Sequence, residues 1–127
     1  MEKIKDIIDD IGNAALEENT KIASLAIISN SGKVIHQTKN FDLTNQTDVI
    51  LDIINGDNQF ILNNSEFDVT YTSSEGIIGT NKNGMGYVII LPFQGGVLVS
   101  YVMPKADPIE ALNFLKTYTK RLNGKVS

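Results

Sequence analysis

The segment between residues 67 and 103 is a run of short predicted strands separated by turns rich in Gly, Asn and Ser, and it leads directly into a helix. Spacers of this length join antiparallel strands, because a parallel crossover needs a dozen or more residues. A helix, a hairpin and a second helix precede the run. Few small folds have this order, and none of them is typically an enzyme. The four strands are expected at residues 67–72, 76–80, 87–93 and 97–103.

The helix after these strands has the clearest local signature in the chain. Asp107 is expected at the N-cap, Pro108 at the first helical position and Glu110 at the third, which is a capping-box arrangement. An apolar stripe follows on one side of the helix and consists of Leu112, Leu115 and Leu122. The sequence therefore predicts a well-capped amphipathic helix as the last element.

The N-terminal part of the chain predicts a helix followed by a hairpin. Isoleucines from Ile4 to Ile11 recur at helical spacing opposite charged residues, and this helix is expected to end at residues 17–19. A β-branched run over residues 22–29 and a second strand over residues 34–38 flank a turn signal. The stripes on the first and last helices predict that both pack on one face of a central antiparallel sheet.

A second helix and a short strand connect the hairpin to the later strands. Thr44 is expected to N-cap this helix, whose apolar stripe includes Ile50 and Ile53. Gly56 is expected to end it in a left-handed conformation. A strand over residues 59–62 and a turn over residues 63–65 follow.

Size and composition exclude several classes of protein. At 127 residues the chain is expected to form one domain, residues 1–127. A net charge of −4 argues against a non-specific nucleic-acid binder. The absence of cysteine excludes disulfides, thiol catalysis and cysteine-ligated metals. No apolar run approaches the roughly 20 residues that span a bilayer, and the N-terminus lacks the apolar core of a signal peptide. The expected location is the cytoplasm.

The residues give little support for catalysis. His36 is the only histidine, and a general base needs a nucleophile or a paired acid that the sequence does not supply. It is interpreted as a solvent-facing strand residue. The G-x-G at Gly84 to Gly86 lacks a third glycine and leads into a strand, so it is interpreted as a turn and not as a phosphate loop. We expect no cofactor, no metal site and no enzymatic activity, and the remaining profile is that of a binding module.

The order of these segments resembles that of the profilin family. Residues 22–28, the glycine turn, residues 34–37 and the pair Asn40 and Phe41 are similar to the first profilin hairpin. Residues 76–78, followed by the basic, glycine-rich stretch 81–88, resemble a later profilin turn. Residues 98–104 and the terminal helix complete the order, so the resemblance covers the whole chain. The Ile-, Asn- and Lys-rich composition is similar to that of a divergent, archaeal relative.

The resemblance implies an α+β profilin-like fold, with a third helix on the face opposite the terminal helices. It also implies a cytoskeletal, monomeric protein that binds actin or an actin-like monomer, occludes one end of it and so regulates polymerisation. A phosphoinositide contact belongs to the same expectation but has no supporting residue pattern here. The positions that match the family's actin face are Val69, Tyr71, Lys82, Glu110 and Asn113.

The sequence departs from the family in two places. Profilins usually bind poly-proline through aromatic residues, but the matching positions in the first helix and second strand are Lys3, Asp6 and Ile35. Only Tyr118 in the last helix keeps an aromatic ring, so we expect poly-proline binding to be weak or absent. A basic residue common on the actin-facing strands falls at Tyr71 or Gly79, so the contact chemistry must differ.

A roadblock/LC7-type domain is the alternative interpretation. Such domains also begin with a helix, a hairpin and a second helix, and they form dimeric scaffolds for small GTPases or motors. They commonly finish at the last strand, whereas a well-capped helix follows here. A dimer in light scattering would favour the roadblock hypothesis, and a monomer would favour the profilin hypothesis.

Overall fold

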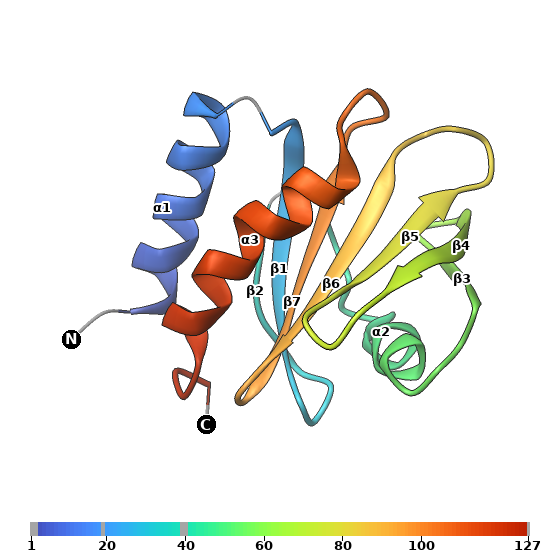
Figure 1. Ribbon diagram of the computed structural model, residues 1–127. Coiled ribbons are helices and arrows are strands. Elements are labelled where there is room, and N and C mark those ends of the chain that lie inside the picture. Colours follow the sequence, from blue (N-terminus) through green and yellow to red (C-terminus); the bar gives the residue numbers. More distant parts are fainter. Residues whose placement is uncertain (1–2, 19, 39–40, 127) are drawn as a thin grey trace.

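The computed structural model describes residues 3–18, 20–38 and 41–126. Its elements follow the predicted order (Figure 1). The helices are α1 (Ile4–Glu17), α2 (Thr47–Ile54) and α3 (Pro108–Leu122). The strands are β1 (Ile22–Ser29), β2 (Val34–Gln37), β3 (Gln59–Leu62), β4 (Ser65–Thr72), β5 (Ile77–Asn81), β6 (Tyr87–Phe93) and β7 (Gly96–Val102). Asn19 and Asn40, which the sequence interpretation used, lie outside the described residues.

The seven strands form one antiparallel sheet in the order β2–β1–β7–β6–β5–β4–β3. From β3 to β7, neighbours in sequence are neighbours in the sheet, as the short spacers predict. The exception is β1, which pairs with β7 and so joins the N-terminal hairpin to the end of the later strands. In this pair the buried Ser100 hydroxyl donates a hydrogen bond of 3.0 Å to the Ser24 carbonyl.

Helices cover both faces of the central strands. On one face α1 and α3 pack together over a core that includes Ile11, Ile27 and Leu115. On the other face α2 contributes Ile50 and Ile53 to a second core cluster. Figure 1 shows α3 passing in front of β1 and β7, while β5, β4 and β3 lie beyond the end of the helix. This arrangement confirms the predicted α+β architecture, with the terminal helices together on one face.

The start of α3 has the predicted N-cap, Asp107, and the predicted Pro108, but within the described residues the Glu110 carboxylate does not form the reciprocal bond of a capping box. The Asp107 carboxylate accepts hydrogen bonds from the backbone N–H groups of Ile109 at 2.9 Å and Glu110 at 3.3 Å. Pro108 occupies the first turn, where a backbone N–H would have no helical acceptor. The cap therefore fixes the position along the chain at which α3 begins.

The predicted cap of α2 is wrong. Thr44 lies before the helix, which begins at Thr47 with Gln46 at the N-cap and no side-chain capping bond. The cause is Asp42, whose carboxylate accepts the Thr44 N–H at 3.0 Å and holds this segment in a turn. That hydrogen bond, helped by the Thr44 hydroxyl and Gln37, lowers the pKa of Asp42. Because the folded protein lowers the pKa of Asp42, the ionised carboxylate stabilises the folded state at a pH above the ordinary pKa of aspartate. This stabilisation is lost as the pH falls through the lowered pKa and the carboxylate becomes protonated.

Other boundaries differ by one or two residues. Asn63 and Asn64 both have left-handed backbones, with φ of 51° and 66°, so they form the turn alone and Ser65 already belongs to β4. β5 and β7 are displaced by one residue from the predicted ranges, and β2 is one residue shorter. Gly56 has a φ of 118° after α2, which confirms the predicted helix end.

Two glycines provide a matched test of the packing. A Cβ on Gly79 would lie 2.5 Å from Cζ of Phe60, whereas a Cβ on Gly12 would meet no heavy atom within 4 Å. We expect Gly79→Ala to lower the free energy of unfolding by about 1–3 kcal/mol through overpacking. Gly12→Ala, on the exposed side of α1, should raise it by about 0.5–1 kcal/mol. Urea denaturation measures both, and equal effects would contradict the described position of the Phe60 ring.

Candidate functional site

The part of the sheet that α3 leaves uncovered has a polar and partly exposed surface. Side chains alternate along β5, so Thr80 lies on the same face as Ile78, which belongs to the core shared by α1 and α3. The strand register places Asp68 opposite Thr80 and Tyr71 opposite Ile78. We call this surface the strand face, and its residues are Asp68, Thr70, Tyr71, Thr80 and Lys82.

A bulge in β4 determines which side chains reach the strand face. The register shifts between Val69, which opposes Gly79, and Tyr71. Val69 packs against the core on the α2 side. The Thr70 hydroxyl lies 2.7 Å from the Thr80 hydroxyl, so Thr70 points to the strand face as Tyr71 does. Tyr71 is 40% exposed, and its ring is available on this surface.

Charges of both signs lie at the other end of the strand face. The Lys82 ammonium is 3.5 Å from a Glu66 carboxylate oxygen and 3.7 Å from an Asp68 oxygen. The same Asp68 oxygen accepts a hydrogen bond of 3.2 Å from Gln59. Exposed pairs of this kind contribute at most about 1 kcal/mol to stability. Their main effect is to orient Lys82 and to set the local charge that a partner meets.

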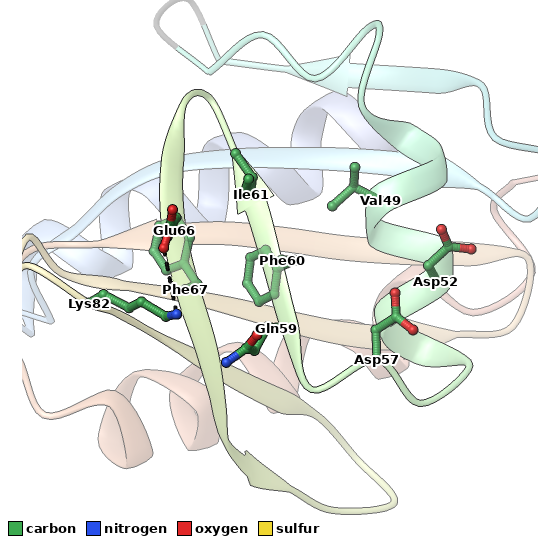
Figure 2. A pocket seen from close by; sticks show the side chains of 9 residues that line it. All are labelled: Val49, Asp52, Asp57, Gln59, Phe60, Ile61, Glu66, Phe67 and Lys82. Atoms are coloured by element: carbon green, nitrogen blue, oxygen red, sulfur yellow. Dashed lines mark ion pairs between the residues drawn. The ribbon is translucent and has the colours of Figure 1, made fainter.

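A hollow of about 480 Å³ lies beside Lys82, between α2 and the β3–β4 hairpin (Figure 2). The rings of Phe60 and Phe67 stack within it, with centroids 5.1 Å apart. Carboxylates surround these rings, and they belong to Asp52, Asp57 and Glu66. The hollow therefore combines aromatic surface with a mainly negative rim, which suits an apolar or cationic side chain.

One flank of α3 borders the strand face. The Lys116 ammonium is 3.1 Å from the Glu75 carboxylate in the turn between β4 and β5, which places this flank beside that turn. Residues three and four apart share one side of a helix. Ile109 and Asn113, both exposed, therefore lie on the same flank as Lys116. We call Ile109, Asn113 and Lys116 the α3 flank.

Glu110 lies on a different side of α3. It lines a small hollow of about 250 Å³ together with Lys21 and Lys105, beyond the C-terminal end of α1. Of the five predicted contact residues, the structure thus places Tyr71 and Lys82 on the strand face and Asn113 on the α3 flank. Val69 and Glu110 point away from this region.

Sequence reasoning missed two apolar residues near this region. Ile109 is 40% exposed on the α3 flank. Ile61 is 58% exposed and lines the hollow beside Lys82, between α2 and the β3–β4 hairpin. The signal for Ile61 was its place in β3, where it alternates with the buried Phe60 and Leu62 and so falls on the polar face. For Thr70 there was no signal, because its orientation depends on the bulge.

His36 lies far from the strand face, on β2 at the other end of the sheet order. It is half-buried and lines a hollow with Asp9 and Asn13 of α1. Within residues 3–18, 20–38 and 41–126, no three or more His, Asp or Glu side chains are placed to hold a metal ion. In the same part of the chain, no helix is long and apolar enough to cross a membrane.

Comparisons with known proteins identify the family. No family model matches the chain. Loki profilin-1 and Loki profilin-2 of Lokiarchaeum sp. (strain GC14_75) are 35% and 33% identical to this chain over an alignment 132 positions long, which covers 95% of this chain and 96% of each relative. The chain belongs to the profilin family. This result confirms the predicted resemblance, agrees with the archaeal character of the composition and excludes the roadblock alternative.

Solved profilin structures share the fold. A LokiProfilin1–rabbit actin complex contains a chain 34% identical, with a TM-score of 0.83 and coverage of 94% of this chain and 93% of that one. A LokiProfilin2–rabbit actin complex gives 32% identity, a TM-score of 0.84 and 96% coverage of both chains. Acanthamoeba castellanii profilin IB is only 20% identical but has a TM-score of 0.71, covering 89% of this chain and 94% of that one. The profilin fold therefore persists well beyond the sequence similarity.

The positions that match the family's proline-binding aromatics do not form an aromatic platform. Lys3 precedes α1, and both it and Asp6 are exposed polar residues. Ile35 is on β2. Tyr118 keeps its ring, but the ring is half-buried and contacts its own helix: Phe114 lies 5.3 Å away and Arg121 lies over the ring at 5.6 Å.

The exposure of Tyr71 predicts a small effect on stability. We expect Tyr71→Ala to lower the free energy of unfolding by about 1 kcal/mol or less, because the ring is on the surface. Phe67→Ala, on the same strand but facing the core, should cost about 3–5 kcal/mol. Chemical denaturation of both variants tests this difference. A loss for Tyr71→Ala as large as that for Phe67→Ala would mean that Tyr71 is a core residue.

Proposed function

We propose that this profilin binds an actin or actin-like monomer through the strand face and the α3 flank. The observation that carries the proposal is the similarity, over almost the whole chain, to two profilins whose structures contain rabbit actin. Support from the structure comes from the exposed Tyr71 and the oriented Lys82 on the strand face, and from the neighbouring α3 flank. Tyr71, Lys82 and Asn113 are the contact residues that this geometry favours.

The proposed action is stoichiometric and not catalytic. A bound profilin would occlude one end of the actin monomer, so that the complex could not add to a filament through that end. This would buffer the free monomer pool and regulate polymerisation. If the profilin prefers a monomer with an open nucleotide cleft, it would also shift the monomer population toward that conformer. The 127 residues would act as one cytoplasmic binding module.

Tyr71 and Lys82 should contribute to this binding in different ways. Aromatic residues near the centre of an interface often contribute 2 kcal/mol or more, while rim charges contribute about 1 kcal/mol or less and mainly affect the association rate. Val69 is not expected to contribute directly, because it packs against the core on the α2 side. Glu110 would contact actin only if the partner also reached the far side of α3.

The first test compares three alanine variants in actin titrations. Tyr71→Ala should weaken binding by about 30-fold, which is the effect of 2 kcal/mol. Lys82→Ala should weaken it by about fivefold or less and mainly change the association rate and its salt dependence. Ile35→Ala is the control, because Ile35 is similarly exposed, at 39%, but lies on β2. Calorimetry gives the affinities and stopped-flow fluorescence gives the rates.

The proposed surface would be wrong if folded Tyr71→Ala protein bound actin as the parent does. It would also be wrong if Ile35→Ala caused the larger loss. No binding of actin by the parent protein would contradict the function itself.

A second test concerns poly-proline. A proline-rich peptide docks on closely spaced exposed aromatic rings, and the matching positions here are Lys3, Asp6, Ile35 and the half-buried Tyr118. We expect weak or no binding between α1 and α3. Chemical shifts of labelled protein during titration with a proline decamer measure this. Strong saturable shifts at Asp6, Ile35 and Tyr118 together would show that the site works without the usual aromatics.

A further inference from the structure

A second hollow, of about 300 Å³, lies on the face of the sheet opposite the strand face. Four buried side chains form its apolar walls: Phe41, Leu62, Phe67 and Val88. All four belong to the core cluster on the α2 side, so the hollow is a gap at the edge of that core. Its volume is at the lower end of the range for small-molecule sites.

Asn81 presents unused hydrogen-bond donors in this hollow. The residue is 5% exposed, and its Oδ1 accepts the backbone N–H groups of Asn83 at 2.8 Å and Met85 at 3.3 Å. These two bonds fix the orientation of the amide, because only the oxygen can accept. The Nδ2 group therefore lies on the other side of the amide, and no acceptor among the described residues bonds to it.

Two hydroxyl groups add to the polar lining. Ser24 is 9% exposed and Ser65 is half-buried, and neither hydroxyl forms a hydrogen bond within the described residues. The Tyr101 hydroxyl is different, because it donates to the carbonyl of Met85 and holds the turn at the edge of the hollow. Among the described residues, no side-chain nitrogen or oxygen is both fully buried and unpaired, so these groups are open to solvent from the hollow, and a bound molecule would replace that water. The hollow thus has donors that a bound molecule could satisfy.

We propose that this hollow binds a small neutral molecule in which a carbonyl oxygen adjoins an aromatic or aliphatic group. The oxygen would accept from Asn81 Nδ2, with the Ser24 or Ser65 hydroxyl as a second partner. The apolar group would lie against Phe41, Leu62 and Phe67. Among the residues that the structure describes, those that line the hollow carry no charge, so a charged ligand would lose its hydration without gaining a counter-ion from them. This site is independent of the actin surface, which lies across the sheet.

Acetanilide is a suitable probe, because it joins a phenyl ring to an amide carbonyl. Titrated into labelled protein, it should cause saturable shifts of the Asn81 side-chain amide and of the backbone amides around Val88 and Ser24. Asn81→Asp keeps the acceptor that the turn requires but replaces the donor group with an oxygen. This variant should weaken acetanilide binding by at least about tenfold.

Asn83→Asp is the matched control, because it makes the same change in the same turn at an exposed side chain that does not line the hollow. It should leave the acetanilide affinity unchanged. Ser24→Ala removes one hydroxyl with little change in volume and should weaken binding about threefold to tenfold. If Asn81→Asp fails to fold, the acetanilide affinity of Ser24→Ala tests the proposal in its place. Absence of saturable shifts at the hollow, or equal affinity in the parent, Asn81→Asp and Ser24→Ala proteins, would overturn the proposal.

Discussion

The pairing of β1 with β7 is the interaction on which the rest of the structure depends. It joins residues that lie 67 to 80 positions apart in the sequence, from Ser29 opposite Gly96 to Ile22 opposite Val102. Without it, the N-terminal hairpin and the later strands would be two separate sheets. With it, β1, β7 and β6 become central strands that must be buried on both faces, so helices are needed on both sides. The Ser100–Ser24 hydrogen bond satisfies polar groups inside this pair.

The same pairing explains where the two proposed binding surfaces lie. The helices α1 and α3 cover the strands around β7, and α2 covers part of the opposite face. The β3–β4–β5 end is therefore uncovered on the α3 side, where Tyr71 and Lys82 form the strand face. On the α2 side, the core ends in a gap beside Asn81. The two proposed sites thus lie at places where the described helices do not fully cover the sheet.

Much of the fold follows from local sequence signals. The face of the sheet to which a single side chain points does not. Asp107 and Pro108 predict the start of α3 because the cap involves only neighbouring residues. The antiparallel order from β3 to β7 follows from spacer length. The predicted N-cap of α2 at Thr44 was wrong because the Asp42 carboxylate binds the Thr44 N–H and holds this segment in a turn before the helix. Val69 and Tyr71 lie on opposite faces because of a bulge at Thr70, which leaves no mark in composition or periodicity. The family resemblance supplied the predicted site positions. Only the strand register shows that Tyr71 points to the strand face while Val69 points to the core on the α2 side.

Hydrogen exchange with and without saturating actin monomer tests the proposed surface most directly. If actin binds the strand face and the α3 flank, amides in residues 66–82 and 107–116 should exchange more slowly in the complex. Amides in α2 and β2 should keep the same rates, because they lie away from the proposed interface. Protection confined to α2 and β2, with no change in β4, β5 or the first half of α3, would contradict the central claim.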